Sequence, residues 1–256
     1  MNISAALKHG TDALAASSST ASLDAELLLA HVLSATESSW LHARPEVQLT
    51  PSEQTAWDDL LSKRASGAPV AYLIGNAVFY GRSFLVTPEV LIPRPETEDL
   101  VDQALAVIDQ LPMDSPVVAD VGTGSGCIAI TLALANPNIQ LFATDVSLPA
   151  LAIAKQNAEA HGVADRITFL HGDMLTPFDA NDRKPSLDLI VSNPPYVPSA
   201  EIDTARQRPE ATGLAFEPRL ALDGSGDGQL FVNKLQTAGI PAVIETTNGA
   251  IVRQHC

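Results

Sequence analysis

Val117-Val118-Ala119-Asp120-Val121-Gly122-Thr123-Gly124-Ser125-Gly126 leads directly into the apolar segment Cys127–Leu134. The first three residues predict a short buried strand and the apolar segment predicts a helix, so the glycines lie in a strand–turn–helix unit. Glycines at 122, 124 and 126 let the backbone turn tightly and approach a ligand without interference from a Cβ atom. The amides that open the helix carry partial positive charge. The stretch therefore predicts a ligand-binding turn at the carboxyl end of a strand.

Strands and helices alternate along the chain after this turn. A further helix is expected at Leu148–Glu159, and further strands at Leu141–Thr144, Ile167–Leu170, Leu187–Val191 and Ala242–Glu245. Alternation at this spacing is typical of βαβ units, in which neighbouring strands run parallel. The sequence therefore predicts an α/β fold with a doubly wound, mostly parallel, Rossmann-like sheet.

The N-terminal residues have a helical character. Thr50-Pro51-Ser52-Glu53 has the pattern of a capping box with proline at the first helical position, and Trp57, Leu60 and Leu61 form an apolar stripe behind it. We expect a small N-terminal helical domain over residues 1–75. Its sequence leaves open whether it recognises a substrate or only supports the structure.

The residues that follow the helical domain are rich in β-formers. They extend from Val78 to Ile92, and Gly81-Arg82 can form a turn between them, so we expect a β-hairpin. This hairpin would link the helical domain to the rest of the chain over residues 76–95. The sheet domain would then occupy residues 96–256.

The composition excludes several classes of protein. The 256 residues are 46% hydrophobic and 18% charged, which is too apolar for a disordered chain. The formal net charge of -15 disfavours binding to a nucleic-acid backbone and favours a neutral, cationic or basic partner. Acidity that only keeps the chain in solution is an equally open explanation. Two cysteines, no signal-peptide pattern and no long apolar run predict a reduced, cytoplasmic protein that does not span a membrane.

The glycine spacing departs from the dinucleotide fingerprint G-x-G-x-x-G. This disfavours a pyrophosphate and favours a ligand such as S-adenosylmethionine. An acidic residue about 20 residues after such a turn accepts ribose hydroxyls, and Asp145 lies at that distance after Gly126. Asp173 can accept the amino group of adenine, and Met174 can pack on its ring. Two plainer explanations stay open: a glycine turn used for packing, and a capping or solvated Asp145.

The expected fourth strand ends in Ser192-Asn193-Pro194-Pro195-Tyr196. Prolines have no N–H group, so they hold a rigid turn whose carbonyls are not paired by local structure. The Asn193 side-chain oxygen and the Pro194 carbonyl can accept the two hydrogens of a planar NH2 group, and the Tyr196 ring can stack on that plane. The stretch predicts a site for a carboxamide or an exocyclic amine. A proline-rich strand exit without a binding role is the plainer alternative.

Asp120–Gly126 together with Asn193–Tyr196 resembles the class I S-adenosylmethionine-dependent methyltransferases that methylate nitrogen. These include adenine N6 and protein glutamine N5 methyltransferases. Further stretches make the chain look like the release factor glutamine N5-methyltransferases of the HemK/PrmC type. These stretches are Gly67–Gly75, Phe79–Gly81, Phe84–Val86, Val90–Glu98, Glu217-Pro218, Ala221-Leu222 and Gly226–Gly228.

The resemblance implies that the chain methylates the glutamine of the Gly-Gly-Gln motif in peptide chain release factors, with S-adenosylhomocysteine as the other product. It implies catalytic roles for Asn193, Pro194 and Tyr196, and substrate binding by these residues and Pro195. The implied donor-binding residues are Gly122, Thr123, Gly124, Ser125, Gly126, Asp145, Met174 and Asn193, and the position of Asp173 after a strand adds that residue to the expected set. No metal is expected. The expected partner is a release factor, without direct contact to nucleic acid or membrane, and the protein is expected to be a monomer.

The expected mechanism is in-line displacement at the sulfonium methyl, with proximity and alignment supplying most of the rate. The polar turn would orient the amide nitrogen and stabilise the charge that develops on it. No strong general base is evident, so solvent would take the proton. Two features depart from the family: Ala77 replaces a usual glutamate, and two usual strands are missing after Ala242–Glu245. We therefore expect a shortened C-terminus with an exposed edge strand prone to association.

Three other functions remain as alternatives. A DNA or RNA adenine N6 methyltransferase shares the Asn193–Tyr196 motif, but the net charge of -15 and the lack of a basic recognition segment disfavour it. A module that binds S-adenosylmethionine without catalysis is the alternative from a different class. A dinucleotide oxidoreductase is disfavoured by the glycine spacing and by Asn193–Tyr196.

Overall fold

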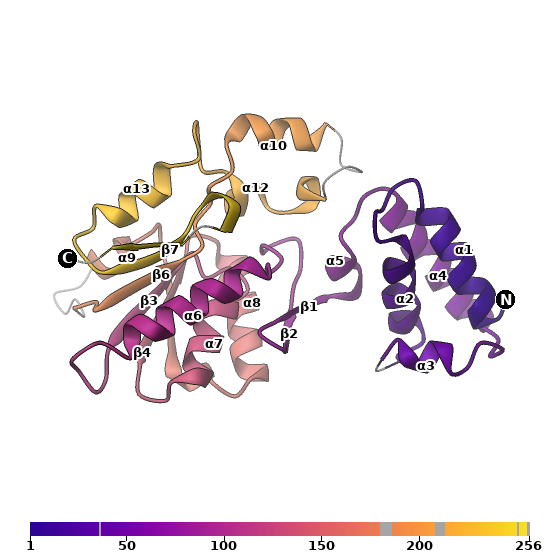
Figure 1. Cartoon of the computed structure of the whole chain (residues 1–256), viewed down its shortest axis with the longest axis horizontal. Coiled ribbons are helices and arrows are strands. Elements are labelled where there is room, and N and C mark those ends of the chain that lie inside the picture. Colours follow the sequence, from indigo (N-terminus) through magenta and orange to yellow (C-terminus); the bar gives the residue numbers. More distant parts are fainter. Residues whose placement is uncertain (36, 180–185, 208–212, 250, 255–256) are drawn as a thin grey trace. The chain divides into compact units, whose positions relative to one another are not determined.

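The computed structural model describes all residues except 36, 180–185, 208–212, 250 and 255–256, and divides into two compact units (Figure 1). The first unit consists of residues 1–75 with 204–216, and the second of residues 76–203 with 217–256. The division into a helical domain, a hairpin linker and a sheet domain stays a prediction. Among the described residues, no helix combines the length and the apolar character needed to cross a bilayer.

The first unit contains helices packed around one apolar core. The helices are α1 (Ile3–Leu14), α2 (Ala21–Val32), α3 (Ser39–His42), α4 (Pro51–Ala65) and α5 (Val70–Ile74), with the short η2 (Leu214–Phe216) in the second segment. The capping box is confirmed, because the Thr50 amide donates to Glu53 Oε2 at 2.7 Å and the Glu53 amide donates to Thr50 Oγ1 at 3.3 Å. Trp57 is fully buried, and a Cβ atom on Gly10 would come within 2.5 Å of its ring. A glycine at this position therefore lets α1 lie against α4.

The second unit is built on a six-stranded sheet with strand order β5-β4-β3-β6-β7-β8. The strands are β3 (Val117–Val121), β4 (Gln140–Asp145), β5 (Ile167–His171), β6 (Leu189–Ser192), β7 (Ala242–Glu245) and β8 (Ile251–Gln254). All neighbouring pairs from β5 to β7 are parallel, and only β8 is antiparallel. The predicted doubly wound, mostly parallel sheet is confirmed.

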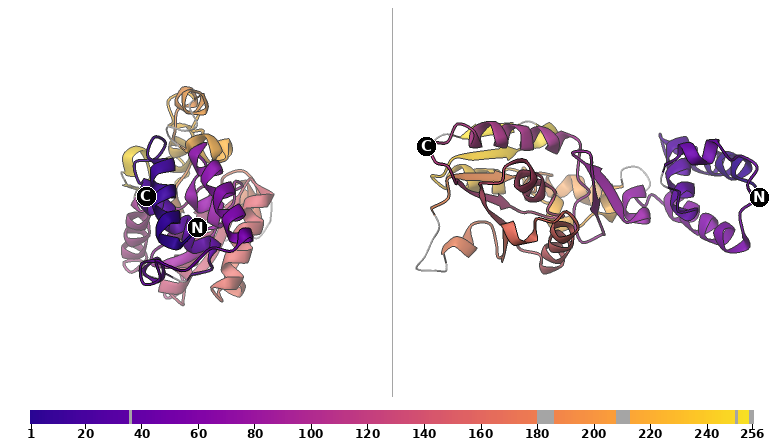
Figure 2. Two further views of the ribbon diagram at one scale, coloured as in Figure 1. Left: turned by 90° about the vertical axis from the view of Figure 1, so that its right-hand side faces the viewer. Right: turned by 90° about the horizontal axis from the view of Figure 1, so that it is seen from below.

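Apolar layers cover both faces of this sheet because side chains alternate along each strand. Leu189 and Val191 join a core with α6 (Glu96–Ile108), α7 (Cys127–Ala135) and α8 (Leu148–Ala160), whereas Ile190 faces the opposite core. That second core includes side chains from α9 (Thr176–Asp179) and α13 (Leu230–Gln236). Both helices are labelled in Figure 1, and Figure 2 gives two further views of the ribbon. The remaining short helices are η1 (Ala164–Arg166), α10 (Ser199–Arg206), α12 (Arg219–Leu222) and η3 (Thr247–Gly249).

The hairpin consists of β1 (Asn76–Phe79) and β2 (Arg82–Leu85). Its turn lies at Tyr80-Gly81, one residue earlier than the predicted Gly81-Arg82. Both turn residues have positive φ, 50° and 70°, as two-residue hairpin turns of the primed type require. The predicted β character ends at Leu85, and Val90 and Ile92 lie in no strand, although both are buried. Burial therefore explains their apolar character without strand pairing.

The edge of the sheet differs from the prediction. Ala242–Glu245 forms β7 as expected, but β8 pairs with it along its whole length, from Ala242 opposite Gln254 to Glu245 opposite Ile251. Strand β7 is therefore covered on both sides, and the expectation that it forms an exposed edge was wrong. Strands β7 and β8 are close in the sequence, and antiparallel neighbours need only a short connection between them.

Candidate active site

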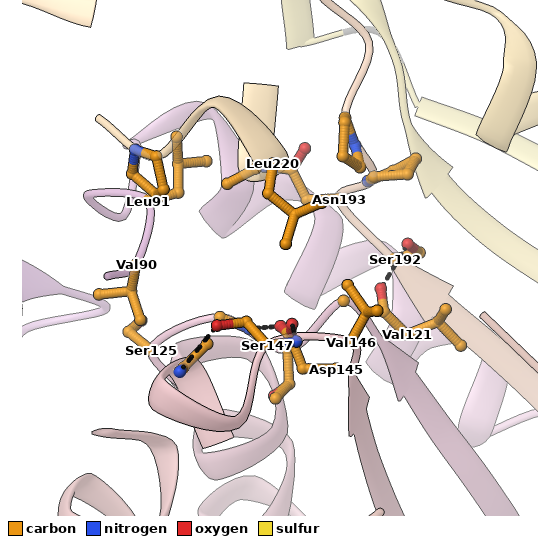
Figure 3. A pocket seen from close by; sticks show the side chains of 18 of the residues that line it. Val90, Leu91, Val121, Ser125, Asp145, Val146, Ser147, Ser192, Asn193 and Leu220 are labelled. Carbon is orange, nitrogen blue, oxygen red and sulfur yellow. Dashed lines mark hydrogen bonds between the residues drawn. The ribbon is translucent and has the colours of Figure 1, made fainter. Parts of the chain in front are cut away.

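One cavity of about 320 Å³ opens at the carboxyl ends of β3, β4 and β6 (Figure 3). This is the edge at which ligands bind to doubly wound sheets. The glycine turn and Asn193–Pro195 both line this cavity, with Asp145, Asp173 and Met174. The two motifs that predict donor and substrate binding therefore share one space, although Asn193 follows Gly126 by 193 − 126 = 67 residues in the sequence.

The glycine turn has the backbone conformation that its sequence predicts. Gly122, Gly124 and Gly126 have φ of 76°, 54° and 82°, a region that other residues rarely adopt. A Cβ atom on Gly124 would meet no atom within 4 Å, so this glycine leaves space in the turn. A Cβ atom on Gly126 would lie 3.1 Å from Ala154, so that glycine lets α7 and α8 pack closely. The turn is thus open around Gly124 and closely packed against α8 at Gly126.

Asp145 ends β4 and is held in the cavity wall by backbone amides. Its Oδ2 accepts from the Gly124 amide at 2.9 Å and its Oδ1 from the Ser147 amide at 2.8 Å. Burial raises the pKa of this carboxyl, and the backbone hydrogen bonds oppose that shift. Each carboxylate oxygen keeps a further lone pair for a ligand hydroxyl. The plainer explanation, that Asp145 caps a helix, also has some support. Asp145 accepts from the amide of Ser147, the residue just before α8.

Asp173 and Met174 lie on the loop after β5 and line the same cavity. Asp173 is exposed, and Met174 has a φ of 53°, unusual for a residue other than glycine. The Met174 carbonyl accepts from Thr144 Oγ1 at 3.3 Å, which ties this loop to β4. A ligand that has one end at the glycine turn could therefore contact Asp173 and Met174 with its other end.

Asn193 lies across the cavity from Ser125, Asp145 and Ser147 (Figure 3). Ser192, just before it, is buried and donates to the Val121 carbonyl at 2.7 Å, which joins β6 to β3. The Asn193 Nδ2 donates to Thr97 Oγ1 at 3.0 Å. Within the described residues, Asn193 Oδ1 has no hydrogen-bond partner, so this oxygen can accept from a ligand.

Tyr196 lies apart from the other residues of its motif. It is not among the described residues that line the cavity, and its hydroxyl donates to Glu245 Oε1 at 3.1 Å. Burial first, and then the Glu245 carboxylate, raise the pKa of this phenol to about 12. A phenol with so high a pKa stays protonated and serves as a hydrogen-bond donor. The expected stacking of the Tyr196 ring on a substrate stays a prediction.

The cavity has charged and apolar components that sequence reasoning did not assign. Arg94 lines the cavity and forms an ion pair with the buried Glu217, whose Oε2 also accepts from the Ile92 amide at 3.2 Å. Leu91 and Leu220 add apolar side chains on the same side as Asn193 (Figure 3). Arg94 and Glu217 both lie in stretches that carry the family resemblance. Their charge within those stretches is the sequence feature that could have marked them as site residues.

The cavity fits S-adenosylmethionine by its own features. It offers a glycine turn without a Cβ obstruction at Gly124, a carboxylate with spare lone pairs at Asp145, and a volume of about 320 Å³. Three or more His, Cys, Asp or Glu side chains arranged to hold a metal occur nowhere in the part of the chain that the structure describes.

Comparison with known proteins places the chain in a family. Residues 5–75 match the family model of the PrmC N-terminal domain, and residues 97–209 match that of the methyltransferase small domain. The release factor glutamine methyltransferase of Chlorobaculum tepidum is 47% identical over 203 residues, which cover 78% of this chain and 67% of that protein. The protein of the same name from Bacillus anthracis is 40% identical over 221 residues, covering 86% and 75%.

Among solved structures, the hMettl16 catalytic domain in complex with MAT2A 3'UTR hairpin 1 matches with a TM-score of 0.49 and 16% identity, over 87% of this chain and 79% of that chain. The two relatives named above are 47% and 40% identical to this chain and match it over 78% and 86% of its length. Because of these matches and the two family models, this chain belongs to the release factor glutamine methyltransferase family, whose cofactor is S-adenosylmethionine.

Proposed function

We propose that this protein methylates the side-chain nitrogen of the glutamine in the Gly-Gly-Gln motif of peptide chain release factors. The observation that carries the proposal is the cavity that holds both the glycine turn and Asn193, with the oxygen of the Asn193 amide unengaged. The names of the two relatives given above support the choice of protein substrate.

The donor half of the proposed site is formed by the glycine turn and the loops after β4 and β5. The turn of Gly122–Gly126 would hold the amino-acid end of S-adenosylmethionine, and Asp145 would accept its ribose hydroxyls. Asp173 and Met174 would hold the adenine. When bound, S-adenosylmethionine supplies an electrophilic methyl group on a sulfonium. The chain's formal charge of -15 favours the cationic donor over its neutral product.

The substrate half would hold the glutamine amide by its two N–H groups. Asn193 Oδ1 and the Pro194 carbonyl would each accept one hydrogen, because Pro194 and Pro195 form a turn without N–H groups of their own. Two acceptors in the plane of an NH2 group fix that plane, and the nitrogen then presents one face to the methyl carbon. Orientation of this kind accounts for most of the rate in a reaction without a strong base.

The apolar part of the cavity would exclude water from the reacting atoms. Val90, Leu91, Leu220 and Phe231 line it together with the polar groups. In a water-poor cavity the hydrogen bonds to the amide are stronger than in solvent. The acceptors on Asn193 and Pro194 also favour the charge that develops on the nitrogen during transfer. The nitrogen gains the methyl group as the carbon–sulfur bond breaks, and it then loses one proton to solvent as the product leaves the cavity.

The test is methyl transfer from labelled S-adenosylmethionine to a purified release factor, followed by peptide mapping. Label on the glutamine of the Gly-Gly-Gln peptide is expected, and separate reactions with duplex DNA and RNA test the adenine alternative. Asn193→Ala should reduce transfer by about 100-fold or more, with a much smaller loss of donor affinity, because the glycine turn and Asp145 would still hold the donor. Asn233→Ala, which removes an exposed amide on α13, is the matched control.

Label on nucleic acid alone would replace the proposal with the adenine N6 alternative. Donor binding without transfer to any of the three substrates would favour the non-catalytic module. Full transfer by Asn193→Ala would remove the role assigned to this side chain.

A further inference from the structure

Asn157 is a buried polar side chain that the proposed reaction does not use. It lies in α8, is only 2% exposed and is not among the described residues that line the cavity. Its side-chain oxygen accepts from the Leu85 amide at 2.7 Å, and its Nδ2 donates to the Leu85 carbonyl at 3.0 Å and to the Ser125 carbonyl at 2.8 Å. Because carbonyls only accept and a backbone amide only donates, these partners fix which end of the side-chain amide carries the nitrogen.

The contact with Ser125 fixes one peptide group of the glycine turn. The Ser125 carbonyl and the Gly126 N–H belong to the same peptide plane. Asn157 holds the carbonyl on the side of α8, and the Gly126 N–H donates to the Thr123 carbonyl at 2.8 Å. Gly126 has a φ of 82°, and glycine adopts φ of either sign, so the residues of the turn alone permit this peptide to turn over. Asn157 therefore selects one of two orientations.

The contact with Leu85 holds a second part of the cavity wall. Leu85 ends β2, and the chain then continues to Glu89, Val90, Leu91, Pro93 and Arg94, which line the cavity. Two hydrogen bonds to the N–H and the carbonyl of one residue resemble a pair in a β-ladder, and they fix both the position and the direction of the backbone. One side chain thus joins the glycine turn to the start of the segment that lines another part of the cavity.

Loss of the Asn157 amide would leave the Ser125 carbonyl buried without its partner, which is costly. Turning the peptide over would relieve this cost, but it would break the hydrogen bond from the Gly126 N–H and move the carbonyl oxygen towards the cavity. There its partial negative charge would lie near the carboxylate at the amino-acid end of the proposed donor. Donor binding would weaken in both cases, whereas Asn193 and its contact with Thr97 would keep their geometry.

We propose that Asn157 is a positioning residue for the methyl donor, which holds the Ser125 carbonyl away from the cavity and ties the glycine turn to Leu85. This proposal rests on the donor half of the proposed function. Asn157 touches neither the donor nor the reacting atoms, and acts through the backbone of Ser125 and Leu85.

The first experiment measures the affinity for S-adenosylhomocysteine by titration calorimetry in Asn157→Leu, which keeps the size of the side chain and removes its hydrogen bonds. Affinity should fall by about 10-fold or more, because a buried carbonyl is left unpaired. In methyl transfer to a release factor, KM for S-adenosylmethionine should rise by a similar factor, and kcat at saturating donor should change by less than about threefold. A merely structural role would lower the folded fraction, and with it kcat, and leave this KM unchanged.

His161→Phe is the matched control. His161 follows α8, its Nε2 lies 3.0 Å from the Ser83 carbonyl of β2, and its ring packs on Phe84 with centroids 4.7 Å apart. Phenylalanine keeps a ring at this position and removes the hydrogen bond to β2, without changing any contact of the glycine turn. This variant should bind S-adenosylhomocysteine with wild-type affinity.

The second experiment needs no variant and measures amide hydrogen exchange by NMR in the wild-type enzyme, with and without S-adenosylhomocysteine. Coupling between two sites is reciprocal, so a ligand at the glycine turn should stabilise the pairing of Asn157 with Leu85. Exchange of the Leu85 amide should slow by about fivefold or more relative to that of Tyr80. The Tyr80 amide is the reference because it lies in the same hairpin and donates to Glu98 Oε1 at 2.7 Å instead.

Three results would overturn the proposal: wild-type donor affinity in Asn157→Leu or a loss confined to kcat, an equal loss of affinity in His161→Phe, or a Leu85 amide no better protected than that of Tyr80. If Asn157→Leu does not fold, the exchange measurement alone decides. Each of these results leaves the proposed function intact. That function fails if the wild-type enzyme binds S-adenosylhomocysteine but does not methylate the release factor, and the calorimetric and exchange tests of Asn157 still stand in that case.

Discussion

Asp120, which precedes the glycine turn, should make the second unit less stable as the pH rises. The side chain is fully buried, and burial is the main cause that raises its pKa from 3.8 to about 7. Hydrogen bonds from the Thr123 hydroxyl at 2.6 Å and the Ala129 amide at 3.2 Å oppose this shift. Both reach Oδ2, and Oδ1 has no partner among the described residues. These two hydrogen bonds therefore offset only part of the cost of burying the ionised Asp120 carboxylate.

The sign and size of the effect follow from proton linkage. The folded chain binds more protons at Asp120 than the unfolded chain between pH 3.8 and about 7. The resulting stabilisation is fully present below the unfolded pKa and is lost as the pH rises through about 7. At about 1.4 kcal/mol for each pKa unit, the full effect is on the order of 4 kcal/mol. Roughly 2.5 kcal/mol of it should disappear between pH 5 and pH 7.5.

Hydrogen exchange of peptides from β3, measured by mass spectrometry from pH 5 to pH 7.5, is the suitable assay. Both tryptophans, Trp40 and Trp57, lie in the first unit, so tryptophan fluorescence does not report on the sheet. The wild-type opening free energy should fall with pH relative to that of Asp120→Asn, which has no proton to lose. The tryptophan unfolding transition should be the same in both proteins, and it serves as the internal control.

Thr123→Val should strengthen the pH dependence of stability, whereas Asp120→Asn should remove it. Thr123→Val keeps the carboxyl but removes the hydroxyl that lowers the Asp120 pKa, so the decline in stability should extend to higher pH. Parallel pH profiles for wild type and Asp120→Asn would refute the reasoning. They would mean that water or local opening solvates the carboxyl, and that its burial does not determine its ionisation.

Three further predictions concern separate parts of the molecule. Asp145→Asn should weaken donor binding by about 10- to 100-fold in titration calorimetry, because hydrogen bonds to a charged acceptor contribute 1.5–3 kcal/mol. Gly228→Ala should destabilise the second unit by about 1–3 kcal/mol, because a Cβ atom would lie 2.2 Å from the Tyr196 carbonyl oxygen at a φ of 80°; unchanged thermal stability would contradict this. Thr50→Ala should lower the stability of the first unit by about 1 kcal/mol in tryptophan fluorescence and leave donor affinity unchanged.

The conformation of the glycine turn, which is proposed to bind the donor, could be predicted because it depends on local sequence. The glycines at 122, 124 and 126 all have positive φ, and this property depends on the residue itself and its immediate neighbours. Asp145 follows from the same logic, since the residue after a predicted strand must lie at the carboxyl edge of the sheet. Strand and helix positions were also close, with the strand predicted at Leu187–Val191 observed at Leu189–Ser192.

The substrate side could be predicted only as a motif. The Asn193–Tyr196 stretch indicates an amide site, but Thr97, the hydrogen-bond partner of the Asn193 side chain, lies 96 residues away in the sequence. Glu217, the partner of Arg94, lies 123 residues away. Pairings over such distances depend on how the sheet folds, and no local pattern specifies them. The one-residue shift of the hairpin turn has a different cause, because Tyr80 adopts a φ of 50° that its residue type does not suggest.

The two halves of the proposed site are supported by different parts of the sheet, which we expect to open at different free energies. The donor half depends on β3, β4 and the turns that follow them, which lie in the centre of the sheet. The substrate half depends in addition on Glu245 at the end of β7, and on residues 222–228, whose backbone is bonded to Val197. Strand β7 has only the short β8 between it and the sheet edge. Peripheral strands open at lower free energy than central ones, so we expect loosening of this side to free the Asn193–Tyr196 turn before it disturbs the glycine turn that is proposed to bind the donor.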